Sequence, residues 1–228
     1  GEPAEPVAGA PAAVPAGVPA PGPDPRPAGP QLFASAGAGA FLLLPDLEEL
    51  LAGDDRLAAD SPAAAAVRAA VLAGALGDRI DAGDPAVRLA AGLTRPPEPQ
   101  VWAACLAGPV TAWADRLGAD PVHGWQHRED YRWVAAAASR HPGLGIAAIA
   151  LLRRFARHLP GFGSARAAHL LPQVVPPGGT VRVDADLVAA ALPTGPLQVL
   201  LALAGLDTFA CRVPWLAARV VVTHEADR

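Results

Sequence analysis

Two histidines four positions apart are the residues best suited to bind a metal ion. His123 and His127 lie in the segment HGWQHRED, and Glu129 and Asp130 follow them closely. On a helix this spacing places both imidazoles on one face, where a carboxylate could complete a zinc site. Gly124 disfavours helix at the first histidine, and the glutamate of an HExxH motif is absent. The segment therefore favours a polar helix start, with metal binding as the alternative.

The chain offers few groups that could act as a nucleophile. Serine occurs at positions 35, 61, 139 and 164, and none of these lies in a GxSxG motif. Cys105 and Cys211 are far apart in apolar segments, which is typical of buried free thiols. Lysine is absent, which excludes a Schiff-base lysine and a phosphate-loop lysine. We therefore predict no catalytic residue and no enzymatic activity.

Two other patterns favour structural roles over chemistry. The glycine-rich segment GAGAF at 37–41 has part of the spacing of a dinucleotide-binding loop, but the third glycine is missing. Asp184 and Asp186 lie between two runs of alternating hydrophobicity, which predicts a hairpin turn rather than a pair of catalytic carboxylates. Neither pattern predicts a cofactor-binding residue.

Composition limits the class of protein. With 228 residues and 52% hydrophobic content, the chain can form one substantial domain or two small ones. The net charge of −4 argues against a general nucleic-acid binder, which would carry a basic excess. The longest apolar run is about ten residues, whereas a membrane span needs roughly 20. No signal-peptide pattern is present at the N-terminus, so we expect a cytoplasmic location.

The segment from Leu144 to Phe162 predicts a central helix. Its first half is apolar on all sides, so we expect other elements to enclose it. Arg153, Arg154, Arg157 and His158 occupy the last turns, where cations interact favourably with the helix dipole, and the LPGF sequence ends the helix. These arginines could contact phosphates or an acidic partner, although a solvated helix face is the commoner outcome.

The remaining pattern predicts an α+β, mostly helical fold. Pro45, Ser61 and Asp84 mark helix starts in a multi-helix part that extends over residues 31–172. From residue 178 the period changes to that of strands, and we predict an antiparallel ββαββ element over 178–228. Residues 1–30 hold ten of the 26 prolines and predict a disordered linker or tail, followed by a single globular domain over 31–228.

Several segments resemble proteins of contractile injection systems, which are phage-tail-like secretion machines. The sequence AGAFLLLPDLEELL (38–51) resembles the AG-x-x-LL-x-P-x-L pattern of tape-measure-type proteins. Three further segments resemble an uncharacterised protein encoded in such gene clusters: ALLRRFARHLPGFGSARAAHLL (150–171), PLQVLLALAGL (196–206) and VPWLAARVVV (213–222). The resemblance covers about half of the chain and implies a structural rather than a catalytic protein.

We therefore expect a non-enzymatic structural or assembly protein of a contractile injection system. The resemblance implies that it acts through protein–protein contacts with other components of the system. We expect no cofactor, no nucleic-acid partner and no membrane span. Two alternatives stay open: a small enzyme or metal-binding domain that uses His123 and His127, and a regulatory ligand-binding domain.

Overall fold

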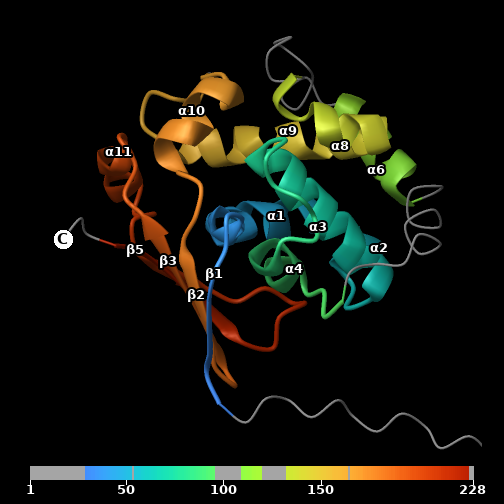
Figure 1. The fold of residues 1–228 in the computed structure, drawn as a ribbon. Helices are drawn as coiled ribbons and strands as arrows, with labels where there is room; N and C mark the ends of the chain where they lie inside the picture. The colour runs from blue at the N-terminus through green and yellow to red at the C-terminus, as the bar shows by residue number, and fades with distance from the viewer. Residues whose placement is uncertain (1–28, 53, 96–108, 120–131, 164, 226–228) are drawn as a thin grey trace, which may run out of the picture.

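The computed structural model describes residues 29–52, 54–95, 109–119, 132–163 and 165–225. In these ranges, helices cover one face of a five-stranded mixed sheet (Figure 1). The expected α+β, mostly helical fold with a strand-rich C-terminal part is confirmed. Most of the predicted linker, residues 1–28, lies outside the described ranges.

The helices begin where the sequence places their starting signals. Pro45 lies in the first turn of its helix, and the Ser61 hydroxyl accepts a hydrogen bond from the Ala64 N–H at 3.2 Å. The Asp84 carboxylate accepts the N–H of Ala86 at 2.9 Å and caps the next helix. The described helices between residues 35 and 179 are the 3-10 helix η1 (Ala38–Leu43), α1 (Leu44–Leu51), α2 (Asp55–Ala58), α3 (Pro62–Leu76), α4 (Pro85–Ala91), α6 (Pro109–Ala119), α8 (Ala135–Arg140), α9 (Pro142–His158) and α10 (Ala167–Val174).

The predicted central helix is α9, which contacts α1, α3, α6, α8 and α10. Its apolar first half is buried as expected, and Phe155 in its second half is only 1% exposed. Close packing of α3 depends on Gly74, because a Cβ there would lie 2.7 Å from the Ala137 Cβ and 3.3 Å from the Ala148 Cβ. Small residues thus bring α3 against α8 and α9.

The bounds of the strands and of the helix among them are β1 (Gln31–Ala34), β2 (Thr180–Val183), β3 (Leu187–Pro193), α11 (Gln198–Leu203), β4 (Phe209–Cys211) and β5 (Arg219–Glu225). The strands lie in the sheet in the order β1-β2-β3-β5-β4. Antiparallel pairing of β2 with β3 confirms the hairpin predicted around Asp184–Asp186. The prediction of a wholly antiparallel ββαββ element is wrong at one position, because β3 and β5 are parallel. Parallel neighbours require a long crossover connection, and α11, β4 and the loop after it provide that connection.

The first described strand, β1, corrects the prediction that residues 31–172 are helical. β1 pairs antiparallel with β2, from which it is separated by almost the whole helical part of the chain. Four residues are too few for a periodic pattern, so only the partner strand makes this segment a strand.

One cluster of buried side chains spans the helices and the inner face of the sheet. Val181, Ala190 and Val222 lie in one register row of the sheet and are buried against η1 and its neighbours. The outer face carries the exposed Arg182 and Arg219. The sheet is therefore covered on one side in the described structure. None of the helices within the described ranges is long and apolar enough to cross a membrane.

Candidate functional site

The predicted metal and nucleophile candidates are only partly described. His123, His127, Glu129 and Asp130 lie outside the described residues, as does Cys105. Over the part of the chain that the structure describes, no three His, Cys, Asp or Glu side chains are grouped as metal ligands. The metal-binding alternative therefore stays a prediction.

Cys211 is a free, half-buried thiol in β4. Burial, and to a lesser extent the charge of Glu48, raises the pKa of Cys211 to about 11. A thiol with a raised pKa carries little thiolate at neutral pH, and the thiolate is the reactive form. Cys211 is therefore poorly suited to nucleophilic chemistry.

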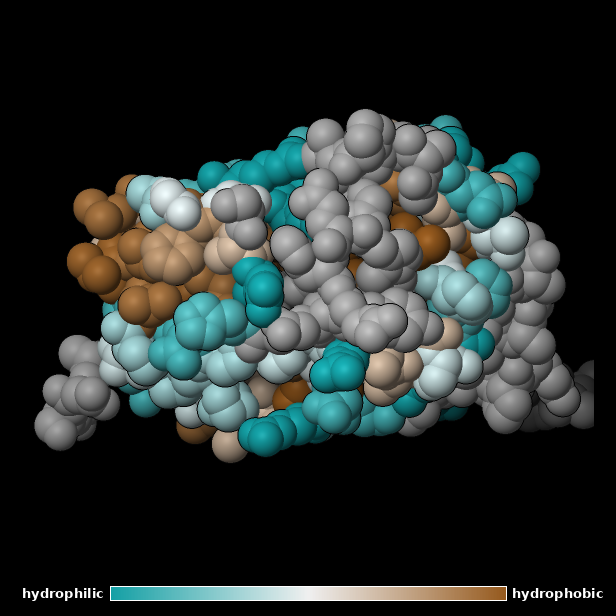
Figure 2. Space-filling view, turned by 90° about the horizontal axis from the view of Figure 1, so that it is seen from above, coloured by the Kyte–Doolittle hydropathy of each residue, from teal (hydrophilic) through white to brown (hydrophobic). Residues whose placement is uncertain are grey.

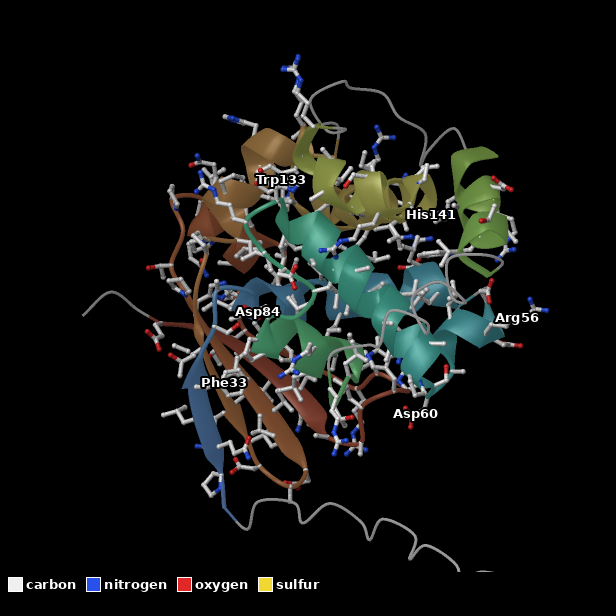
Figure 3. The ribbon with its side chains drawn as sticks, turned by 45° about the vertical axis from the view of Figure 1, so that its right-hand side comes forward. Phe33, Arg56, Asp60, Asp84, Trp133 and His141 are labelled. Carbon is white, nitrogen blue, oxygen red and sulfur yellow. The ribbon has the colours of Figure 1, made fainter. Side chains whose placement is uncertain are left out.

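The glycine-rich segment at 37–41 follows β1 and opens η1, as a phosphate-binding loop would. However, the Gly37 N–H donates to the Asp84 carboxylate at 3.2 Å, and the Ser35 hydroxyl donates to the same carboxylate. A Cβ at Gly37 would lie 2.7 Å from the Val87 side chain, which leaves no room for a ligand. Asp84 thus occupies the position of an anion at the junction between β1 and α4 (Figure 3). Its role is structural.

The basic end of α9 partly serves to attach this helix to α1. Arg154 forms an ion pair with Glu49, and the His158 imidazole is hydrogen-bonded to the Asp46 carboxylate at 2.9 Å. Asp46 is only 4% exposed, and this burial raises its pKa, although the hydrogen bond from His158 lowers it. Arg157 is exposed on the same helix. An intramolecular role thus accounts for two of the basic side chains predicted to face solvent.

A fully buried arginine, Arg68 in α3, is the charged group that sequence reasoning missed. Its guanidinium donates to the carbonyls of Leu57 at 2.8 Å, Ala59 at 2.9 Å and Ala91 at 3.0 Å. These carbonyls lie at the ends of α2 and α4, where backbone acceptors lack helical partners and the dipole is negative. The sequence does carry a signal for a buried arginine, because Arg68 is the one charged residue in the otherwise apolar α3 sequence PAAAAVRAAVLAGAL.

Trp215 connects this arginine to the C-terminal part of the fold. The Arg68 guanidinium carbon lies 4.5 Å from the centre of the Trp215 ring, and the indole N–H donates to the Ala90 carbonyl at 2.9 Å. Burial lowers the pKa of Arg68 to about 10, against the opposing effect of the Asp60 charge, so the side chain is still protonated at neutral pH. Arg68 therefore holds α2, α4 and the Trp215 segment together.

Helix α11 carries an exposed apolar patch on the described surface. Val199 is 62% exposed and Leu203 is 68% exposed, and Ala202 lies exposed beside them. Figure 2 shows hydrophobic side chains gathered at the left of the view, the side on which α11 lies in Figure 1. Leu201 on the opposite side of the helix is fully buried, so it anchors α11 to the core. We call Val199, Ala202 and Leu203 the α11 patch.

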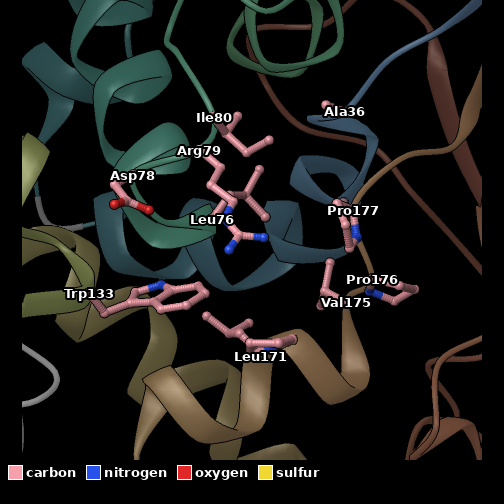
Figure 4. Close-up of a pocket in the computed structure, with 12 residues that line it drawn as sticks. Ala36, Leu76, Asp78, Arg79, Ile80, Trp133, Leu171, Val175, Pro176 and Pro177 are labelled. Atoms are coloured by element: carbon pink, nitrogen blue, oxygen red, sulfur yellow. The ribbon is translucent and has the colours of Figure 1, made fainter.

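A cavity of about 270 Å³ lies between the end of α3, the start of η1 and α10 (Figure 4). Its walls are mainly apolar, and the charged residues among its described lining are Asp78 and Arg79. The apolar lining includes Leu76, Ile80, Trp133, Leu171, Val175 and Pro176. Sequence reasoning missed this cavity because the lining residues are dispersed along the chain.

The described structure defines an α+β protein whose candidate interaction features are an exposed apolar helix face and an apolar cavity. Comparisons with protein-family models, with curated proteins and with solved structures found no match to this chain. A function must therefore be inferred from the features of this chain alone.

Proposed function

We propose that this chain is a non-enzymatic structural or assembly protein of a contractile injection system and that it binds a partner protein through the α11 patch. The observation that carries the proposal is the exposure of Val199 and Leu203, two large apolar side chains spaced i, i+4 on one helix. Exposed contiguous apolar surface has an energetic penalty in water and commonly marks a protein–protein interface.

The chemistry of α11 defines the kind of partner surface. The helix sequence QVLLAL contains no charged residue, so the patch offers hydrophobic contacts and no ion pairs. An apolar helix face of this type fits an apolar groove that accepts anchors at i and i+4. Burying Val199 and Leu203 completely would contribute about 1.5–3 kcal/mol per side chain. We therefore expect an interface with a small apolar centre.

The sequence resemblance to proteins of injection-system gene clusters supports the proposal that the partner is a component of such a system. The α11 patch lies within PLQVLLALAGL (196–206), one of the segments that resemble the protein of injection-system gene clusters. The resemblance and the exposed patch thus concern the same helix. Folding leaves the apolar face of this helix exposed, and docking on another component of the injection system would bury it.

The proposal is tested by its gene neighbourhood and by reconstitution. We expect neighbouring genes for sheath, tube, baseplate or AAA-type ATPase components, and a stoichiometric complex with at least one of these proteins in size-exclusion chromatography with light scattering. A gene neighbourhood without such components, or no complex with any of them, would contradict the proposal.

A further inference from the structure

The cavity beside α10 combines apolar walls with one available cation among the described residues that line it. Leu76, Leu171 and Val175 supply aliphatic surface, and Trp133 supplies an aromatic wall. Pockets that bind small molecules are typically apolar with a few polar groups that fix orientation. None of the residues that line the cavity belongs to α11, so this site is separate from the proposed docking patch.

The aromatic wall is held in place before any ligand binds. The Trp133 indole N–H donates to the Ala75 carbonyl at 2.9 Å. Gly77 has φ of 94°, and a Cβ there would lie 2.8 Å from the Trp133 ring, so the ring lies directly against the backbone. A fixed wall reduces the entropy lost when a ligand is ordered against it.

The available cation is Arg79. Its side chain is exposed, and within the described ranges no hydrogen bond or ion pair engages its guanidinium. Figure 4 shows the Arg79 guanidinium directed toward the middle of the lining residues, with the Asp78 carboxylate at their margin. A guanidinium matches the geometry of a carboxylate and binds it with two parallel hydrogen bonds. Among the described lining residues Arg79 is the single cation, and Asp78 is a carboxylate, so a second negative charge on the ligand would have no partner and a single negative charge fits best.

We propose that this cavity binds a short apolar monocarboxylate, with its hydrocarbon part against Trp133 and Leu171 and its carboxylate on Arg79. The volume of about 270 Å³ sets the size of the ligand. This volume lies just below the range of about 300–1,000 Å³ that is typical of small-molecule pockets, so the ligand should be small. Hexanoate and phenylacetate have this size and this charge.

The test uses the full chain and two-dimensional NMR of the tryptophan side chains. The indole N–H resonance of Trp133, assigned with the Trp133→Phe variant, is followed during titration with hexanoate and with the uncharged hexanamide. Hexanoate should shift this resonance in a saturable manner and bind about tenfold more tightly than hexanamide, because the amide oxygen can still accept from Arg79 but lacks the negative charge and the second parallel hydrogen bond of the carboxylate. No saturable shift, or equal affinity for both compounds, would overturn the proposal.

Two variants locate the site, and a third is the control. Arg79→Gln should reduce hexanoate affinity about tenfold and abolish the preference over hexanamide. Ala36→Leu places a larger side chain in the cavity lining and should reduce the affinity for both compounds. Arg157→Gln removes an exposed arginine elsewhere and should leave both affinities unchanged. Because Arg79 is exposed, its variant tests the proposal even if Ala36→Leu does not fold. Unchanged hexanoate affinity in Arg79→Gln would refute the site.

Discussion

Replacing Arg68 with methionine tests whether a buried cation holds separate parts of the fold together. Methionine keeps an unbranched apolar side chain in the same space, so the change removes mainly the charge and its hydrogen bonds. Three hydrogen bonds to backbone carbonyls are lost, and hydrogen bonds from a charged donor contribute about 1.5–3 kcal/mol each. The carbonyls of Leu57 and Ala91 are left without this donor.

The free-energy cost of burying the Arg68 charge must be subtracted from this loss of hydrogen-bond energy. Burial lowers the pKa of Arg68 to about 10, and this shift corresponds to a cost of about 3 kcal/mol for keeping the side chain charged in the fold. Three hydrogen bonds of about 1.5–3 kcal/mol, less about 3 kcal/mol, leave a net loss of about 2–6 kcal/mol for Arg68→Met. Loss of the contact with Trp215 adds to this value.

The assay is urea unfolding followed by far-UV circular dichroism. Arg56→Met is the matched control, because Arg56 is exposed on the neighbouring helix α2, and its free energy of unfolding should change by less than about 0.5 kcal/mol. An apolar replacement of a buried ion sometimes stabilises a protein. If Arg68→Met equals or exceeds the stability of the unsubstituted protein, the hydrogen-bonding role assigned to Arg68 is refuted.

Three further predictions concern the packing and pH dependence of the fold. Phe155→Ala should lower the free energy of unfolding by about 3–5 kcal/mol, because Phe155 is buried in the central helix; a loss below about 1 kcal/mol in urea unfolding would show that α9 is peripheral. Gly74→Val should lower it by about 1–3 kcal/mol, because the new side chain would overlap Ala137; unchanged stability in the same assay would contradict the close packing of α3. Asp46 has a folded-state pKa raised above its ordinary value of 3.8, so its contribution to stability is present below this value and is lost as pH rises through the raised pKa. The melting temperature of Asp46→Asn relative to the unsubstituted protein should therefore increase as the pH rises from below 3.8 through the raised pKa, and a difference that stays constant or falls would oppose this assignment.

Local signals predicted much of the helical architecture. The apolar first half of α9 and its LPGF stop, the caps at Ser61 and Asp84 and the hairpin turn near Asp184 each depend on residues close together in the chain. Such signals act through neighbouring backbone groups, so they remain interpretable without knowledge of the tertiary structure.

The features that escaped prediction depend on distant partners. β1 is a strand because β2 lies beside it, and the parallel pairing of β3 with β5 follows from the path of the chain between them. The role of Arg68 depends on carbonyls in two other helices. No sequence period encodes contacts of this kind, because their energy depends on the assembled tertiary structure.

The α11 patch could not be predicted from the sequence for a related reason. The segment PLQVLLALAGL predicts the helix α11, but its composition would suit a buried helix equally well. Only the arrangement of neighbouring elements leaves Val199 and Leu203 exposed while burying Leu201. The metal-binding prediction for His123 and His127 stays untested by the described residues.

The most direct test of the proposed function is the affinity of the α11 patch for an injection-system component that forms a complex with this chain. Leu203→Gln is compared with Leu32→Gln, because the two leucines are equally exposed, at 68% and 69%, on different elements. Removing a buried leucine contact should cost about 1.5–3 kcal/mol, so Leu203→Gln should weaken binding by about tenfold or more. Leu32→Gln should leave the dissociation constant unchanged. Equal affinities for both variants would contradict the proposal that the α11 patch is the docking surface.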